Sequence, residues 1–281
     1  MSGEEARKVL HKELHSEFPF LGEDIPDAML ESILEMRAGG NPFLGYPAVE
    51  TSGFSGNLSK LGPLFVRYKG DHVILGSAIH VKDYWETFDI SQDDVLIIGA
   101  WKTGTSWLGE VVYCILHPDY DPKDASRGNT NVRLPNLDMF WRLKVIGAMP
   151  PPRSLKSHFH LNAMPPSLLQ AKPKIIYIYR NPRDTCVSMY HYCRMFKPLS
   201  YTGSFDDFFE LFVKGTVPSG PYMTHIKSFW TERASLDIMF VAYEDLHKHF
   251  AREVTRMATF LGKEVSHQQI DTMEGTCLSL P

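Results

Sequence analysis

Three short runs of β-forming, apolar residues constrain the fold more than any other feature of the sequence. They are Val95–Gly99 (VLIIG), Lys174–Tyr179 (KIIYIY) and Ile238–Tyr243 (IMFVAY). Each is as short and as apolar as a strand buried on both faces of a parallel sheet. A helical pattern follows, from about Thr105 to Leu116 after the first run and from Asp184 to about Met195 after the second. Strand alternating with helix predicts a single α/β domain with a central parallel sheet flanked by helices.

Two further helices are indicated by the residues at their ends. Ser204 followed by Asp207 resembles a capping box and predicts a helix that ends near Gly215. After the third strand, one helix is expected to present a single apolar face, with Gly262 just past its end. The apolar positions of that face are Leu246, Phe250, Val254, Met257 and Leu261.

The first 60 residues differ in character from the rest. We predict a lead-in with a mobile loop over residues 1–60 and the main domain over residues 61–281. Pro26 to Ala38 has the spacing of a short amphipathic helix, and the Gly- and Ser-rich stretch Thr51–Ser59 is interpreted as the loop. The charged segment 1–15 lacks the apolar core of a secretory signal, and no run reaches the roughly 20 apolar residues of a membrane span. We therefore expect a cytoplasmic protein with no membrane partner.

Charge and cysteine content narrow the class of ligand. The 281 residues carry a formal net charge of −4, whereas nucleic-acid-binding domains usually have a basic excess. An anionic ligand must therefore be held by a local basic cluster. The cysteines at positions 114, 186, 193 and 277 form no CxxC pair and show no metal-ligand spacing. We expect free thiols in a reducing compartment and no bound metal.

The segment Gly99–Trp107 (GAWKTGTSW) joins the first strand to its helix and suits an anion. Gly104 lets the backbone approach a ligand closely, and the first amides of the following helix point toward it. Lys102 adds a full charge, and hydroxyl groups at positions 103, 105 and 106 add donors. The pattern differs from a Walker A loop because the lysine precedes the last glycine, and no acidic residue is clearly placed to hold the Mg²⁺ of a kinase. An ordinary capped helix start is the simpler alternative for this segment alone.

The loop is one of several blocks that occur in a fixed order. Lys102–Trp107 is followed by Pro150–His158, Tyr179–Asp184, Val187–His191 and Val241–Asp245. Together these blocks resemble the cytosolic sulfotransferase family, whose members move a sulfuryl group from 3′-phosphoadenosine 5′-phosphosulfate (PAPS) to a hydroxyl group. The resemblance covers most of residues 62–262 and implies a P-loop-like strand–loop–helix that binds the phosphosulfate.

The resemblance also implies the residues that bind the nucleotide. Arg180 and Ser188 are expected at its 3′-phosphate, and two aromatic rings at its adenine. The full set is Lys102, Thr103, Gly104, Thr105, Ser106, Trp107, Arg180, Ser188 and Tyr243. A surface ion pair between Arg180 and Asp184 is the alternative for that arginine.

His158 is implied as the general base of the reaction. Lys102 is expected to stabilise charge on the leaving oxygen, and Lys156 to assist at the transferred group. A lone histidine is more often a structural or surface residue. From the residues themselves, the role is supported by a strand-like alternation that points Lys156 and His158 the same way.

The sequence defines the acceptor pocket less sharply. Its candidate wall consists of Leu137, Met139, Phe140 and Tyr192, although ordinary packing is at least as good an interpretation for each of them. An apolar wall favours a small phenol, alcohol or steroid-like acceptor over a sugar polymer. The expected partners are PAPS and such a small molecule, with no nucleic acid. A monomer or weak dimer is expected because the family's dimerisation segment has no counterpart.

The resemblance ends after Gly262. The family's Arg-Lys-Gly and Gly-Asp-Trp blocks, which close over the 3′-phosphate, have no match in the residues that follow. Charge-assisted hydrogen bonds contribute about 1.5–3 kcal/mol each, so losing two is expected to weaken nucleotide binding. A weak or inactive relative that acts as a nucleotide-binding or interaction protein is therefore the alternative to an active sulfotransferase. A P-loop kinase and a dehydratase-like relative that sulfates its substrate transiently also stay open.

Overall fold

The computed structural model describes residues 85–120, 133–138, 146–195 and 201–277, residues 4–5, 8–9 and 12, and the backbone of β1 (Phe65–Tyr68) and β2 (Asp71–Ile74). Strands β1 and β2 form an antiparallel pair of their own. The helix expected over Pro26–Ala38 and the loop expected over Thr51–Ser59 lie outside the described residues. The division of the chain at residue 60 therefore stays a prediction.

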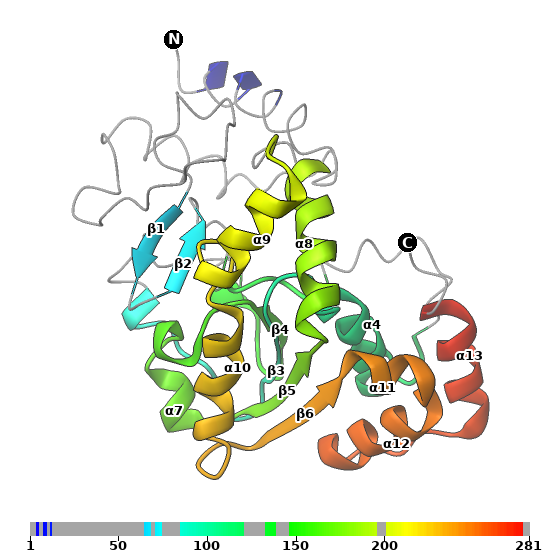
Figure 1. Ribbon diagram of the computed structural model, residues 1–281. Coiled ribbons are helices and arrows are strands. Elements are labelled where there is room, and N and C mark those ends of the chain that lie inside the picture. Colours follow the sequence, from blue (N-terminus) through cyan, green and yellow to red (C-terminus); the bar gives the residue numbers. More distant parts are fainter. Residues whose placement is uncertain are drawn as a thin grey trace.

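A four-stranded parallel sheet in the order β4–β3–β5–β6 lies at the centre of the fold (Figure 1). Its strands are β3 (Val95–Ile98), β4 (Ser154–Ser157), β5 (Lys174–Tyr179) and β6 (Ile238–Ala242). All three neighbouring pairs are parallel. The predicted α/β class is confirmed, and the three predicted strands occur within one residue of their expected ends.

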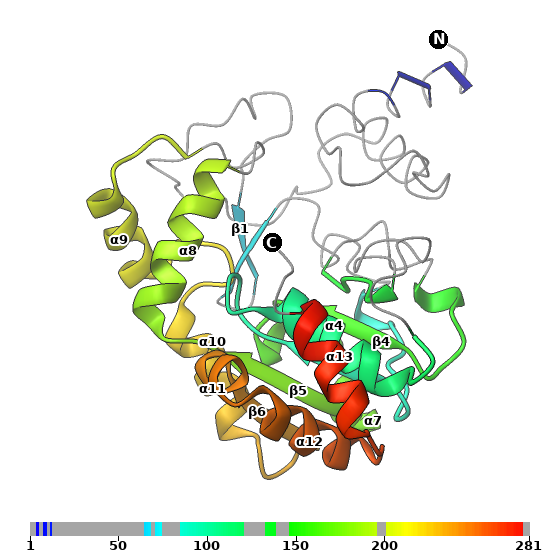
Figure 2. The same cartoon turned by 90° about the vertical axis from the view of Figure 1, so that its right-hand side faces the viewer.

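Helices cover both faces of this sheet (Figures 1 and 2). On one face lie α7 (Ser167–Ala171), α10 (Tyr222–Thr231) and the 3₁₀ helix η4 (Leu161–Ala163). On the other lie α4 (Thr105–Leu116), α12 (Phe250–Leu261) and α13 (His267–Cys277). Both faces must be covered because the strands are apolar on each side and neither side can be left in water.

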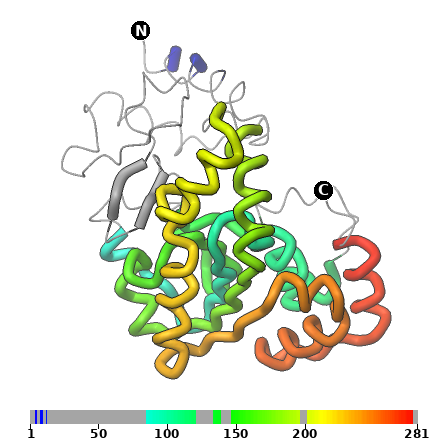
Figure 3. Tube along the Cα trace, viewed as in Figure 1, coloured from blue at the N-terminus to red at the C-terminus, as the bar shows by residue number. Residues whose placement is uncertain are grey.

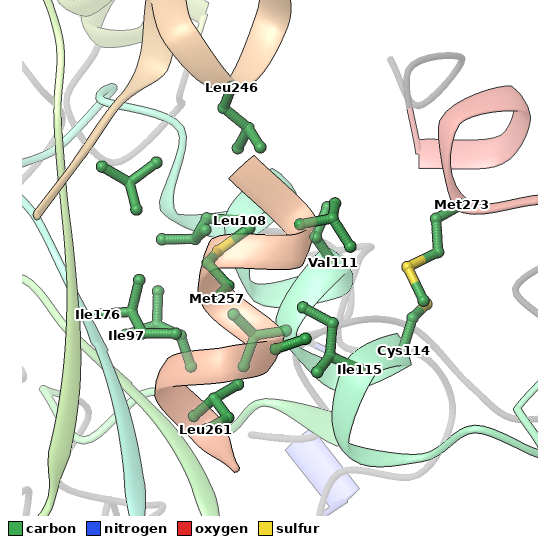
Figure 4. Packing of buried hydrophobic residues seen from close by; sticks show 14 of the residues in the cluster. Ile97, Leu108, Val111, Cys114, Ile115, Ile176, Leu246, Met257, Leu261 and Met273 are labelled. Atoms are coloured by element: carbon green, nitrogen blue, oxygen red, sulfur yellow. The ribbon is translucent and has the colours of Figure 1, made fainter. Parts of the chain in front are cut away.

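The two sides of strand β3 enter two separate apolar clusters. Leu96 and Ile98 pack in the cluster on the α7 and α10 side, whereas Val95 and Ile97 pack in the cluster on the α4 and α12 side. This alternation follows from the two-residue period of a strand. Figure 4 shows the second cluster, in which Met257 of α12 lies among side chains of α4 and of the sheet. Each fully buried Leu, Ile, Val or Met stabilises the fold by about 1.5–3 kcal/mol. The packed core therefore holds the ends of the strands in fixed positions.

Helix α8 (Pro182–Met195) follows β5 directly and extends beyond the carboxyl ends of the strands (Figure 3). It begins two residues earlier than the sequence predicted. Pro182 occupies its first position, where a missing N–H costs nothing, and the side chain of Asn181 accepts a hydrogen bond from the Arg183 amide at 2.9 Å. The early start places Arg180 only two residues before the first residue of the helix.

Helix α9 (Phe205–Lys214) has the predicted capping box and the predicted end. The Ser204 hydroxyl accepts from the Asp207 amide at 3.1 Å, and the Asp207 carboxylate accepts from the Ser204 amide at 3.2 Å. The helix stops at Gly215, whose φ of 75° lies in the left-handed region that glycine tolerates. Short side chains and a glycine therefore set both ends of α9, as the sequence indicated.

The single helix predicted after β6 is wrong, because the chain forms two helices there. α11 (Tyr243–Lys248) and α12 are separated by His249, which has the non-helical dihedral angles φ −134° and ψ 48°. Leu246 of α11 and Phe250 of α12 both reach the same apolar cluster. The apolar spacing is satisfied by two short helices as well as by one long helix, so it could not report the break. Gly262 does end α12, with a φ of 68°.

The amino ends of the strands are closed by a buried ion pair. Arg153 precedes β4 and Asp94 precedes β3, and the guanidinium and carboxylate meet at 2.6 Å with both side chains almost fully buried. The same guanidinium donates to the carbonyl oxygens of Ile146 at 3.1 Å and Asp89 at 2.9 Å. Every nitrogen of this arginine side chain therefore has a partner.

Two further observations concern the described helices and the cysteines. None of these helices is long and apolar enough to cross a membrane. The thiols of Cys114, Cys186, Cys193 and Cys277 are buried and form no disulfide.

Candidate active site

The loop between β3 and α4 forms an open helix N-terminus. Gly104 stands immediately before α4 with a φ of 99°, and no side chain caps the helix. The first amides of α4 therefore have no intrahelical acceptor, which is the arrangement that binds anions. A Cβ atom at Gly104 would lie 2.7 Å from a ring carbon of Tyr243, so the close approach of that ring also requires glycine. The predicted anion loop has the local geometry that an anionic group needs.

Lys102 is held in an uncommon backbone conformation within this loop. Its φ is 70°, and strained residues of this kind cluster at functional sites. Its ammonium group lies 4.4 Å from the centre of the Tyr192 ring. Burial and then the charge of Arg180 lower the pKa of Lys102. The charge of Lys102 is thus partly desolvated and close to a second cation, which is a favourable place for a bound anion.

The hydroxyl groups of the loop have different surroundings. The Thr103 hydroxyl is buried and donates to the carbonyl oxygen of Ala100 at 2.7 Å. In this structure its proton therefore braces the loop, whereas the sequence suggested a donor to the ligand. Thr105 is buried at the first helical position, and Ser106 is exposed.

Arg180 lies at the carboxyl end of β5 with its guanidinium carbon 4.2 Å from the centre of the Tyr243 ring. Its Nε atom is buried and has no hydrogen-bond partner, and its Nη1 atom approaches the Lys102 carbonyl oxygen at 3.5 Å. Tyr222 accepts from the Arg180 amide at 3.1 Å and donates back to its carbonyl oxygen. No carboxylate of the described residues lies within ion-pair distance of Arg180, so the alternative pairing with Asp184 does not form. Ser188 is half-buried on α8.

Trp107 of α4 lies beside the same tyrosine ring. The rings of Trp107 and Tyr243 are 5.4 Å apart at 69°, and the ring of Phe250 stacks on the tryptophan at 6.3 Å. The Trp107 indole nitrogen is buried without a hydrogen-bond partner. Buried donors without partners are rare, and each calls for an explanation. Two of the three such atoms in the described part of the chain belong to Trp107 and Arg180, whose side chains both lie beside the Tyr243 ring.

His158 follows β4 and is oriented by the backbone of the anion loop. Its Nδ1 atom lies 2.7 Å from the carbonyl oxygen of Gly99. A carbonyl oxygen only accepts, so Nδ1 carries the proton and Nε2 carries the lone pair. Burial, followed by the positive charges of Lys156 and Lys102, lowers the pKa of His158 from 6.5 to about 3. The imidazole is therefore neutral at physiological pH and has the form that accepts a proton.

Lys156 and a carboxylate that the sequence analysis missed lie close to His158. Lys156 is buried within β4, opposite Ile97 of β3. Asp138 is also buried, and it accepts from the Ser157 hydroxyl at 2.6 Å and from the His158 amide at 2.8 Å. Burial raises the pKa of Asp138 to about 7, although these hydrogen bonds and the charge of Lys156 oppose the rise. The centre thus contains two cations, a neutral imidazole and one carboxylate.

The residues expected in the acceptor wall are only partly placed by the structure. Tyr192 is half-buried on α8, and its ring meets the ring of Trp101 edge-on at 5.5 Å. The Trp101 ring in turn lies 6.1 Å from the His158 imidazole. Leu137 is completely buried in the cluster on the α7 and α10 side, which is the ordinary packing left open above. Met139 and Phe140 lie outside the described residues.

Three residues near His158 had no signal in the sequence. Asp138, Trp101 and His225 belong to separate segments, and none stands in a recognisable pattern. His225 of α10 contacts the carbonyl oxygen of His158. Only the folded chain brings these residues together. Among the described residues, no three His, Cys, Asp or Glu side chains gather as a metal site would require, and the expectation of no metal stays a prediction.

Comparisons with known proteins place this geometry in a family. The model of the sulfotransferase domain matches residues 92–278. Sulfotransferase 4A1 of Mus musculus is 32% identical over 194 residues, which are 69% of this chain and 68% of that protein. Sulfotransferase 1E1 of Cavia porcellus is 33% identical over 196 residues, covering 67% of this chain and 66% of that protein.

Two solved structures that contain PAP are similar to this chain in fold. Mouse sulfotransferase SULT7A1 complexed with PAP is similar with a TM-score of 0.66 and 27% identity, covering 76% of this chain and 74% of that one. Retinol dehydratase in complex with androsterone and the inactive cofactor PAP has a TM-score of 0.70 and 25% identity, covering 83% and 79%. These matches, together with the open loop, the unpaired arginine and the neutral histidine, show that the chain belongs to the sulfotransferase family.

Proposed function

We propose that the protein transfers the sulfuryl group of PAPS to a hydroxyl group of a small apolar or aromatic acceptor. In this reaction the acceptor oxygen forms a bond to sulfur, and the bond between sulfur and the 5′-phosphate oxygen breaks. The acceptor proton passes to Nε2 of His158, and 3′-phosphoadenosine 5′-phosphate (PAP) leaves with the electron pair of the broken bond. No covalent intermediate on the protein is needed.

The orientation of His158 carries this proposal. Because Nδ1 donates to the Gly99 carbonyl oxygen at 2.7 Å, the lone pair of the imidazole is on Nε2. Gly99 belongs to the loop that would hold the phosphosulfate, so the same backbone that binds the donor also orients the base. A bound anion would offset the positive charges that lower the pKa of His158, and so make the imidazole a stronger base.

The nucleotide is proposed to bind where buried donors have no partner. Arg180 Nε and Trp107 Nε1 have no hydrogen-bond partner among the described residues, and a phosphate and a purine could satisfy them. The amides at the start of α4 and the ammonium group of Lys102 would hold the phosphosulfate, and Ser188 would assist Arg180 at the 3′-phosphate. The PAP in the mouse SULT7A1 structure supports this assignment by similarity.

The acceptor is proposed to enter beside Trp101 and Tyr192. These two rings stand next to the imidazole, and aromatic surface of this kind suits a planar or alicyclic apolar molecule. Retinol dehydratase, which is similar in fold, was solved with androsterone, and this supports a phenol, alcohol or steroid-like acceptor.

The test is a transfer assay with PAPS and a panel of phenols, aliphatic alcohols and hydroxysteroids, comparing the natural chain with His158→Ala. We expect the variant to lose roughly 10²-fold or more in kcat, because a positioned base contributes that much, and to keep its PAP affinity within about threefold. His267→Ala, an exposed histidine on α13, is the matched control and should keep full activity.

The outcomes separate the proposed enzyme from a binding protein. If the natural chain binds PAP but sulfates no acceptor in the panel, the nucleotide-binding or interaction protein is the better interpretation. If His158→Ala retains natural turnover, the role of His158 as base is lost while the transferase activity stands.

A further inference from the structure

Among the described residues, every polar group of His158 except Nε2 has a hydrogen-bond partner. Its imidazole Nδ1 donates to Gly99, and its backbone amide donates to Oδ2 of Asp138 at 2.8 Å. Its backbone carbonyl oxygen accepts from Nε2 of His225 at 3.1 Å. The three partners come from the anion loop, from the segment before β4 and from α10. The position of the imidazole is therefore fixed by the whole fold rather than by its neighbours in sequence.

Asp138 braces more than one residue of the turn that carries His158. Its second oxygen accepts from the Ser157 hydroxyl at 2.6 Å, and that hydroxyl oxygen accepts from the Phe159 amide at 3.2 Å. One buried carboxylate thus fixes three consecutive residues, 157–159. With each of its oxygens accepting one donor, the side chain matches the requirement that buried polar groups be satisfied.

Both ring nitrogens of His225 have hydrogen-bond partners, which fixes the orientation of its imidazole. Its Nε2 must donate to the His158 carbonyl oxygen, so its Nδ1 must accept, and the Tyr177 hydroxyl of β5 supplies that proton at 2.7 Å. Burial and then the charge of His160 lower the pKa of His225, which keeps its ring neutral. The His160 ring packs against it at 4.7 Å. A neutral ring in one tautomer is a fixed donor rather than a titrating group.

We propose that Asp138 and His225 are positioning residues for His158: they hold its backbone amide and carbonyl so that the imidazole stays between the anion loop and the acceptor. This inference rests on the proposed function, in which His158 is the base. Neither residue touches the reacting atoms. A reacting group displaced by about 1 Å can cost on the order of a hundredfold in rate, so loss of either support is expected to reduce turnover.

The first test separates turnover from nucleotide binding. We expect Asp138→Ala and His225→Phe each to lower kcat by about tenfold to a hundredfold and to leave PAP affinity within about threefold. The conservative variants should recover most of the activity. In Asp138→Asn the amide oxygen can accept from the His158 amide, and in His225→Gln the amide nitrogen can donate to the His158 carbonyl oxygen.

The second test does not depend on activity. Hydrogen exchange followed by mass spectrometry should show faster exchange in peptides that contain residues 157–159 in Asp138→Ala, with peptides of β5 and α12 unchanged. The matched control is Glu253→Gln, which alters an equally buried carboxylate that pairs with Arg252 and Arg256 of α12. Glu253→Gln should speed hydrogen exchange in α12. It should leave the exchange of residues 157–159 and the kcat unchanged.

The results distinguish this inference from the proposed function. If His158→Ala is inactive but Asp138→Ala and His225→Phe turn over like the natural chain, the positioning role is overturned and the base stands. If the conservative variants lose kcat, PAP affinity and thermal stability together, the two residues are merely structural and the inference is overturned. If His158→Ala remains fully active, the assignment of His158 as the base fails. If hydrogen exchange at residues 157–159 is unchanged in Asp138→Ala, the positioning role of Asp138 is overturned.

Discussion

Two arginines stand at opposite ends of the same sheet and have opposite surroundings. Arg153, at the amino ends of the strands, forms a buried ion pair with Asp94, and every nitrogen of its guanidinium has an acceptor. Arg180, at the carboxyl end of β5, has no carboxylate partner among the described residues and keeps a buried Nε without an acceptor. The hydrogen bonds of the first arginine are all made within the fold, whereas the second is the arginine that we propose binds an anion.

Other residues at the two ends of the sheet differ in the same way as the two arginines. At the amino ends, the Ser167 hydroxyl donates to the Phe88 carbonyl oxygen and accepts from the Ile90 amide. At the carboxyl ends, Lys102 has a positive φ, α4 has no capping side chain, and burial keeps His158 neutral. The buried donors without partners on Arg180 and Trp107 therefore lie at the same end of the sheet as Lys102 and His158. This difference assigns stability to the amino ends and chemistry to the carboxyl ends, as expected for open α/β sheets.

The largest effect on the free energy of unfolding is expected from removing the Arg153–Asp94 ion pair at the amino ends of the strands. Arg153→Met leaves the Asp94 carboxylate buried without its partner, and we expect the free energy of unfolding to fall by about 3–5 kcal/mol. PAP affinity, measured at a temperature where the variant stays folded, should be unchanged within about twofold. Urea unfolding together with a PAP titration checks both parts. A loss of PAP affinity in the folded variant would show that the two ends are not independent.

A smaller effect is expected from Gly104→Ala at the anion loop. The left-handed backbone and the close Tyr243 ring both disfavour a Cβ, so we expect a loss of about 1–3 kcal/mol in the free energy of unfolding and weaker PAP binding. Gly275→Ala in α13 is the matched control, because a Cβ there would meet no atom within 4 Å. That variant should be neutral or slightly stabilising. Equal behaviour of the two variants would count against a special loop conformation.

A pH dependence is expected to arise from Asp138. Burial raises the pKa of this carboxyl from 3.8 to about 7, so between these values the folded chain holds a proton that the unfolded chain has lost. Stability from this group is therefore greatest below pH 3.8 and is lost as the pH rises through about 7. We expect the difference in free energy of unfolding between the natural chain and Asp138→Asn to fall over this range and to level off above it. A difference that stays constant with pH would contradict the raised pKa.

The parts of the molecule that sequence predicts are those set by local patterns. Apolar runs revealed β3, β5 and β6, and the capping box revealed α9, because each pattern acts on its own few residues. The break at His249 was missed, since apolar spacing reports which side of a helix is buried and not the dihedral angles of one residue.

The site shows the same limit. The anion loop and Arg180 lie at strand ends, where the fold class directs attention, and His158 was implied by family resemblance. Asp138 and His225 were missed because their relation to His158 is created by tertiary contacts across 20 and 67 positions of the chain. No local pattern encodes such a contact.

A calorimetric titration with PAP tests the central claim, that the carboxyl end of the sheet binds an anion. Arg180→Met removes the unpaired guanidinium and keeps most of its apolar stem, so we expect PAP affinity to fall by about one to two powers of ten at an unchanged unfolding midpoint. Arg153→Met in the same titration should show the reverse pattern, with lower stability and natural affinity. Natural PAP affinity in folded Arg180→Met, or no PAP binding by the folded natural chain, would contradict the account.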